Sequence, residues 1–174
     1  MTETPGVRFA SLVLALLAVL ALSGCARHEE RVYRSLSDVA HTDESSIIGI
    51  VDVPLDATDI RIRFDVETDH YYFSYSTRDV MYAVRHVEMA PVADEAHEEA
   101  RDSVWRGVDL PAQVAIHRQC IVHPDIYGRG TPWRVEIRFV ASADGRQHQW
   151  NEQTDPELIT LLCAEEQRRV DAAQ

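Results

Sequence analysis

The residues with the most distinctive side-chain chemistry are three cysteines, at Cys25, Cys120 and Cys163. A cysteine thiol can be acylated, form a disulfide, attack a substrate as a thiolate, or bind a soft metal ion. His117 and His123 flank Cys120 and add the other donor type of a zinc site. Because side chains alternate across a β-strand, this spacing separates Cys120 from both histidines in a strand. We therefore expect no metal site at this segment.

Two other segments carry residue types used in catalysis, and both are incomplete. The sequence HEEAR, at residues 97–101, resembles the start of a zinc-binding helix, but Arg101 stands where the second histidine ligand is required. In His123-Pro124-Asp125 a carboxylate could orient an imidazole, and a turn at Pro124 explains the same sequence. We expect no catalytic residue, no metal and no cofactor, so the chain is predicted not to be an enzyme. A small histidine-dependent hydrolase or a metal-binding protein is the alternative.

Cys25 ends an apolar segment near the start of the chain. Residues 9–22, FASLVLALLAVLAL, carry no charge, and a helix of this length spans about 21 Å, less than the roughly 30 Å of a bilayer core. This length is typical of a signal peptide. The sequence Leu22-Ser23-Gly24-Cys25 resembles the lipobox of bacterial lipoproteins. The resemblance implies cleavage between Gly24 and Cys25 and a diacylglycerol thioether on Cys25. An uncleaved signal anchor and an ordinary secretory signal are the alternatives.

The same resemblance implies where the protein is held. A lipid on Cys25 would attach it to a membrane of the cell envelope, and Ala26 stands where an aspartate favours retention in the inner membrane. We therefore expect the outer membrane, with the protein facing the periplasm. Because Cys25 would be acylated, Cys120 and Cys163 remain as a pair in an oxidising compartment, which predicts a disulfide. Two buried free thiols are the alternative.

Composition limits the partners and the number of domains. The 174 residues include 29 acidic and 17 basic residues, all of the latter arginine, and the net charge is -12. A surface of this sign disfavours binding to nucleic acid or to anionic lipid headgroups, so we expect no nucleic-acid partner. With 45% hydrophobic residues, the chain can build one folded core. We expect a signal peptide at 1–24, a lipid-attached tether at 25–46 and a single globular domain at 47–174.

Hydrophobic patterns within the expected domain predict both strands and helices. Residues 59–67 and 133–141 alternate apolar and polar side chains, and each is followed by a turn and a partner strand, which predicts two antiparallel hairpins. Apolar periodicity predicts helices at 77–89, 93–107 and 156–170, the last burying Leu158, Leu161 and Leu162. The predicted fold is α+β, a mostly antiparallel sheet built from hairpins with helices packed on one face.

Aromatic residues gather on the predicted strands. Tyr71, Tyr72 and Tyr75 share one strand, so at least one of them faces away from the core. With Trp133 and Trp150 they are expected to form an exposed aromatic surface for a protein partner. Burial of these side chains beneath the helices is the alternative.

Residues 53–84 and 136–150 are also similar to a pattern in uncharacterised bacterial envelope proteins, in which hairpins and an aromatic strand precede a helix. This resemblance implies no known activity. Our hypothesis is a non-enzymatic, lipid-anchored envelope protein that binds a protein partner in the periplasm as an accessory or assembly factor. An immunity or inhibitor lipoprotein that blocks a basic toxin is the alternative.

Overall fold

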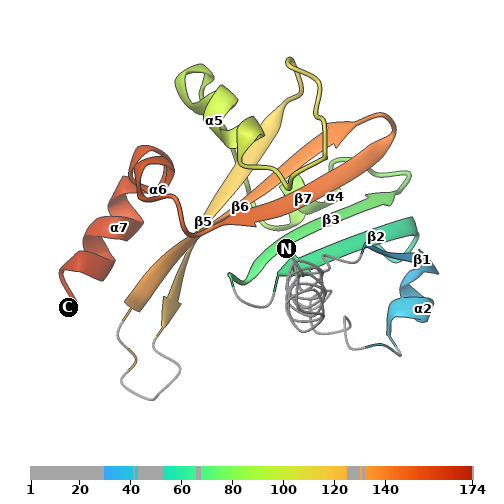
Figure 1. Cartoon of the computed structure of the whole chain (residues 1–174), viewed down its shortest axis with the longest axis horizontal. Coiled ribbons are helices and arrows are strands. Elements are labelled where there is room, and N and C mark those ends of the chain that lie inside the picture. The colour runs from blue at the N-terminus through green and yellow to red at the C-terminus, as the bar shows by residue number, and fades with distance from the viewer. Residues whose placement is uncertain are drawn as a thin grey trace, which may run out of the picture.

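The computed structural model describes residues 30–40, 42, 53–65, 68–124, 130 and 132–173. Within them lies one antiparallel sheet of seven strands, in the order β1-β2-β3-β7-β6-β5-β4, accompanied by short helices (Figure 1). The predicted α+β class is therefore confirmed. Residues 1–29, which include the predicted leader, Cys25 and the expected cleavage site, lie outside the described residues. None of the described helices is long and apolar enough to cross a membrane.

The strands follow the chain in two groups. The first group is β1 (Arg31–Ser35), β2 (Thr58–Asp65) and β3 (His70–Ser76). The second is β4 (Ala90–Pro91), β5 (Ile116–Pro124), β6 (Pro132–Ala143) and β7 (Arg146–Glu152). The helices are α2 (Leu36–Val39), α4 (Tyr82–His86), the 3-10 turn η1 (Asp94–Ala96), α5 (His97–Asp102), α6 (Pro156–Leu162) and α7 (Ala164–Asp171).

Both predicted hairpins are present. The β6–β7 turn has positive φ angles at Asp144 and Gly145, 51° and 71°, as a two-residue turn of matching twist requires. The strands of the two hairpins then join through β3 and β7, with Tyr72 opposite Trp150. This pairing, between segments far apart in sequence, makes one sheet from two.

The domain begins earlier than predicted. Residues 31–39, expected to be part of the tether, form β1 and α2, and β1 pairs with β2. The polar composition of this segment suits an edge strand, because one face and one edge of such a strand meet solvent. Only residues 25–30 therefore separate Cys25 from the sheet.

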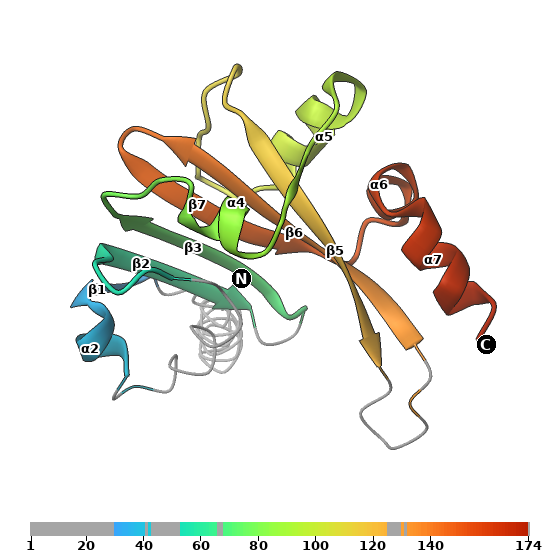
Figure 2. The same ribbon diagram turned by 180° about the vertical axis from the view of Figure 1, so that it is seen from behind.

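The helices cover both faces of the sheet, not one face as predicted (Figure 2). On one face, Ile137 and Phe139 pack in a core cluster with Ala96 and Ala100, next to α6 and α7. On the opposite face, Val140 packs against α4. A second cluster on that opposite face joins β2 and β3 to Val39 of α2. The central strands β3 and β7 each bury five consecutive residues, so both of their faces need a cover.

Two predicted helices are shorter than their apolar periodicity suggested. Only residues 82–86 of the predicted helix 77–89 are helical, because Asp79 accepts a hydrogen bond from the Met81 backbone and holds the preceding residues in a turn. Glu88 has a φ of 52°, which ends the helix. The predicted helix at 93–107 ends at Asp102, and residues 103–110 form a loop.

The predicted C-terminal helix is divided into α6 and α7 at Cys163, which has non-helical backbone angles (φ -130°, ψ 39°). Asp155 caps α6 by accepting hydrogen bonds from the backbone of Glu157 (2.9 Å) and Leu158 (3.0 Å). Cys163 forms the expected disulfide with Cys120 of β5. In the chain-entropy model, closing this loop contributes roughly 4 kcal/mol to stability.

The prediction that all three leucines of this helix are buried was wrong for one of them. Leu158 and Leu162 are buried, but Leu161 is 51% exposed. We expect Leu162→Ala to lower the free energy of unfolding by about 2–5 kcal/mol, because it leaves a cavity in the core. Leu161→Ala should change it by no more than about 0.5 kcal/mol. Urea titration of both variants tests this, and equal losses would contradict the orientation of α6.

Candidate functional site

The expected aromatic surface is not present, and this prediction was wrong. Tyr71, Tyr72, Tyr75 and Trp150 are all buried, and of the five residues only Trp133 is substantially exposed, at 42%. The physical reason is the central position of β3 and β7, since both faces of these strands are covered. Trp150 stacks on Phe139 in the core, with ring centroids 5.2 Å apart.

The buried tyrosine hydroxyls find partners inside the protein. Tyr75 donates to Oε1 of Gln147 at 2.7 Å. The hydroxyl of Tyr72 lies 2.8 Å from Nδ1 of His148. Burial raises the pKa of Tyr72 and lowers the pKa of His148, so this pair is neutral at neutral pH. These aromatic residues therefore stabilise the sheet and offer no binding surface.

The histidines that were considered for catalysis do not converge. His117 and His123 both lie on β5, where they pair with Val140 and Arg134 at separate positions of β6. Asp125, the expected partner of His123, lies outside the described residues. The structure brings His123 to another carboxylate instead.

That carboxylate is Glu136 of β6, which sequence analysis missed. Nε2 of His123 lies 2.6 Å from Oε2 of Glu136, and Nε of Arg138 donates to Oε1 at 3.1 Å. The alternation of side chains along the two strands could have predicted this contact, because residues 123, 134, 136 and 138 share one face of β5 and β6. Both oxygens of this buried carboxylate therefore have a polar partner, which fixes the side chains of His123, Glu136 and Arg138 on the β5–β6 hairpin.

A different feature combines concavity with charge. Two neighbouring hollows of about 420 Å³ each lie beside α5 and share Asp102, Ser103 and Glu152. We call them together the acidic groove. Six carboxylates line it, three of them from α5: Asp65, Glu98, Glu99, Asp102, Glu152 and Asp155.

Local structure holds these carboxylates in place. Ala96 and Ala100 bury one side of η1 and α5, which turns Glu98 and Glu99 towards solvent. Oε1 of Glu152 accepts hydrogen bonds from the backbone of the next three residues, at 2.8, 2.6 and 3.0 Å. Ser103 receives a hydrogen bond from Nε1 of Trp150 at 3.0 Å, which links the groove to the core.

The described basic residues near the groove are fewer than the carboxylates that line it. Nη2 of Arg101 lies 3.2 Å from Asp102 and 3.8 Å from Glu98. Arg106 lines one of the two hollows. Arg63 donates a hydrogen bond to the backbone carbonyl of Arg106 at 3.2 Å. Among the described residues, the six lining carboxylates outnumber these three guanidinium groups, so the groove attracts cations and repels anions.

The groove also has an aromatic component. The rings of His70 and Trp105 are 5.1 Å apart, and both residues line the hollow next to Asp65. Burial lowers the pKa of His70, while the negative charges of Glu152 and Asp65 oppose that shift. Nε2 of His70 is buried and has no hydrogen-bond partner among the residues that the structure covers. A neutral imidazole beside acidic groups adds no positive charge to the groove.

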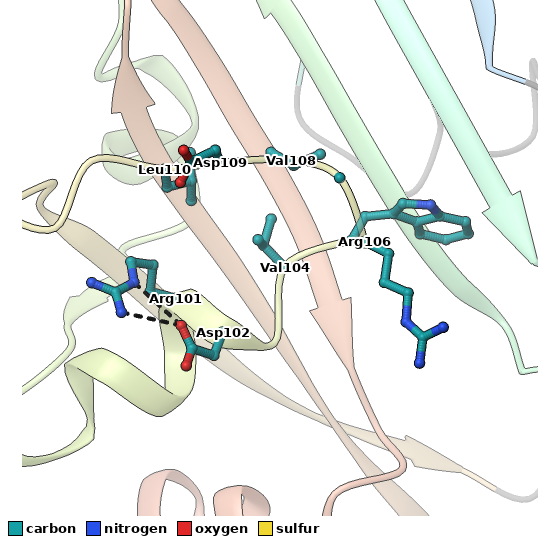
Figure 3. Close-up of a pocket in the computed structure, with 9 residues that line it drawn as sticks. Arg101, Asp102, Val104, Arg106, Val108, Asp109 and Leu110 are labelled. Atoms are coloured by element: carbon teal, nitrogen blue, oxygen red, sulfur yellow. Dashed lines mark hydrogen bonds and ion pairs between the residues drawn. The ribbon is translucent and has the colours of Figure 1, made fainter.

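The loop after α5 forms a further hollow of about 390 Å³ that continues from the groove (Figure 3). It shares Asp102, Val104, Trp105 and Arg106 with the hollows described above. Figure 3 shows the Arg101–Asp102 ion pair on one side and the Arg106 side chain extending away from it. Acidic, basic and apolar side chains therefore all line this hollow.

Comparison with known proteins gives no match to a family model, to a curated protein or to a solved structure. The chemistry of the described residues is therefore the basis for any functional interpretation.

The buried His148 makes stability depend on pH. Its pKa is lowered from 6.5 by burial, so below about pH 6.5 the unfolded chain binds more protons than the folded chain. We expect the free energy of unfolding to fall as the pH drops from 7.5 to 5, with a slope of up to about 1.4 kcal/mol per pH unit for this group. Urea titrations at several pH values measure the slope.

His148→Gln keeps a polar partner for Tyr72 and should reduce that slope. The matched control, His86→Gln, changes an exposed histidine and should leave the slope unchanged. A slope that is the same in both variants would show that His148 does not contribute to it.

Proposed function

We propose that this protein is a lipid-anchored protein of the cell envelope that binds a basic protein partner through the acidic groove. It acts as an accessory or assembly factor and not as an enzyme. The observation that carries the proposal is the convergence of six carboxylates from four separate parts of the chain around one concave surface.

Charge complementarity supports a basic partner. Carboxylates that line a concave surface focus the negative potential, and the net charge of -12 adds a long-range attraction that speeds encounter. An arginine or lysine side chain of the partner would pair with Glu152 or Asp102 and contact the ring of Trp105. The same charges disfavour nucleic acid and anionic lipid as ligands of this surface.

The anchor is supported by the leader and by the length of the tether. Residues 25–30 can span at most about 21 Å between Cys25 and the start of β1. A lipid on Cys25 would therefore hold the folded domain close to the membrane surface. Partners of such a domain are proteins that lie at, or are assembled into, the same membrane.

The anchor is tested by metabolic labelling with palmitate. We expect the full-length chain to incorporate label and to fractionate with membranes. Cys25→Ser should lose the label and move the protein to the soluble fraction, provided that the chain is still exported. Labelling that survives this substitution would contradict lipidation at Cys25.

The groove is tested by site-specific photocrosslinking in intact cells. A photoreactive residue in place of Glu99, which is exposed on α5, should crosslink to a discrete protein with a basic surface. The same residue in place of Glu165, which is exposed on α7, should not crosslink to it. Neutralising the groove with Glu98→Gln and Asp102→Asn should reduce the yield at least tenfold, as should high salt.

The control for neutralisation is the pair Glu88→Gln and Glu165→Gln, two exposed acids outside the groove. This variant removes the same charge and should retain the crosslink. Equal loss in both variants would attribute binding to net charge alone. A crosslink unaffected by neutralisation of the groove would overturn the proposed role of the groove.

A further inference from the structure

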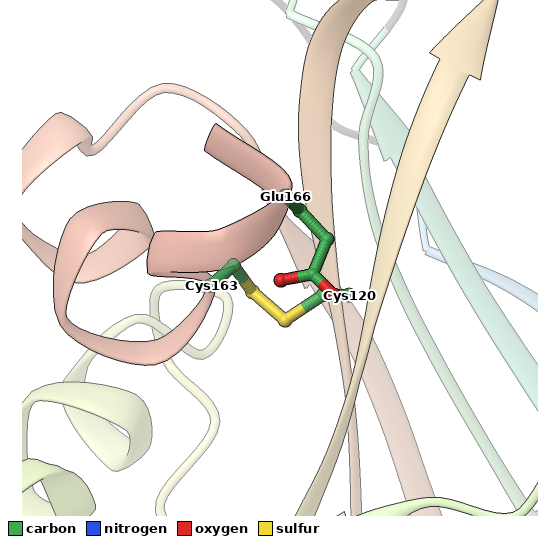
Figure 4. A group of neighbouring side chains, drawn as sticks. All are labelled: Cys120, Cys163 and Glu166. Atoms are coloured by element: carbon green, nitrogen blue, oxygen red, sulfur yellow. A yellow bond between two sulfur atoms is a disulfide. The ribbon is translucent and has the colours of Figure 1, made fainter. Parts of the chain in front are cut away.

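A carboxylate faces the disulfide from close range (Figure 4). The sulfur atoms of Cys120 and Cys163 and a carboxylate oxygen of Glu166 all lie within 4.8 Å of one another. Figure 4 shows the side chain of Glu166 reaching from α7 towards the disulfide. These three side chains come from β5, from the joint between α6 and α7, and from α7 itself.

The backbone positions the side chains of Cys120, Cys163 and Glu166 next to one another. Cys163 is the N-cap residue of α7, and Glu166 follows three residues later, which places both on one side of the first turn. The backbone nitrogen of Cys163 donates to the carbonyl of Ile159 at 2.7 Å. Cys120 is fixed from the other side by the long pairing of β5 with β6. The backbone thus keeps all three side chains next to one another.

Glu166 has no evident role in the disulfide-bonded state. It is half-buried, and no cation or hydrogen-bond donor among the described residues pairs with its carboxylate. A carboxylate gains nothing from the lone pairs of two bonded sulfur atoms, and partial burial of its charge is unfavourable. A cation bound by the Glu166 carboxylate and by the two cysteine sulfurs would compensate this partly buried negative charge.

We propose that, when the disulfide is reduced, Cys120, Cys163 and Glu166 bind one divalent zinc ion. Two thiolates and one carboxylate are ligands that zinc accepts, and water would complete a tetrahedral set. Zinc–sulfur bonds of about 2.3 Å place the two sulfurs about 3.8 Å apart in that geometry, so the sulfurs must move apart from bonding distance when the ion enters. The disulfide and the zinc site are then exclusive states of the same two sulfur atoms.

The redox step requires a dithiol reductant. Its thiolate attacks Sγ of Cys120, which is half-buried, and the bond to the buried Cys163 breaks, with Cys163 leaving as a thiolate. The second thiol of the reductant then attacks the mixed disulfide, which releases Cys120 as a thiolate and leaves the reductant oxidised. Zinc binds the two thiolates, and any protons that they acquired are released to solvent.

The surroundings favour this ligand set electrostatically. Nη1 of Arg118 lies 3.1 Å from Sγ of Cys120, as a donor to a sulfur ligand would. Zinc with two thiolates and one carboxylate has a formal charge of -1, and the guanidinium of Arg118 brings the group to neutrality. Partial burial of the group is less costly when the charges sum to zero.

Cobalt(II) replaces zinc and reports its ligands by absorption. The full-length chain, purified in detergent, is titrated with cobalt(II) before and after reduction with a phosphine that does not bind the metal. We expect a thiolate-to-cobalt charge-transfer band in the reduced protein only, saturating at one ion per chain and displaced by zinc. Glu166→Ala should weaken zinc binding at least tenfold, measured by competition with a chromophoric chelator.

The matched control is Glu165→Ala, which removes the exposed neighbour of Glu166 and should leave zinc affinity unchanged. Circular dichroism follows the fold of the reduced chain, and if the chain loses structure without metal, zinc should restore it. The proposal is overturned by a reduced protein without the charge-transfer band, by equal binding in the oxidised protein, or by equal effects of the two substitutions.

Discussion

The pairing of β3 with β7 is the constraint on which the rest of the structure depends. It joins two hairpins that are separate in sequence and places ten successively buried residues, five from each strand, at the centre of the sheet. Both faces of these strands must then be covered, which requires α5, α6 and α7 on one side and α2 and α4 on the other. The burial of the tyrosines and of Trp150 follows from this position and not from their own preference.

A row of polar residues specifies this pairing. Gln147, Gln149 and Asn151 alternate along β7 and are almost fully buried. Gln147 accepts from the hydroxyl of Tyr75, Gln149 donates to the same hydroxyl at 2.9 Å, and Asn151 accepts from the Tyr71 backbone at 2.8 Å. A shift of one residue would leave buried polar groups without partners, so these bonds select one register.

Sequence patterns predicted the parts of the fold that depend on neighbouring residues. The alternation in β2 and β6, the turn that follows each of these strands and the start of a helix at Pro156 are local signals, and the structure contains all of them. The β3–β7 pairing has no local signal, so the aromatic strand was expected to be exposed. The acidic groove was missed for the same reason, because Asp65, Asp102 and Glu152 meet only in the folded chain.

The sheet also determines where the proposed groove would lie in an anchored protein. If Cys25 carries the proposed lipid, the chain reaches the sheet at its β1 edge, within about 21 Å of the lipid attachment. Carboxylates of the groove repel anionic headgroups over a Debye length of about 8 Å at physiological salt. Arg63 pairs with Glu30, just before β1, and donates to the backbone carbonyl of Arg106, which lines the groove, so the groove lies beside the end of the proposed tether. A lipid on Cys25 would therefore keep the groove close to the membrane surface, within reach of a basic surface on a protein at the same membrane, while repulsion from anionic headgroups would keep the groove itself free of lipid.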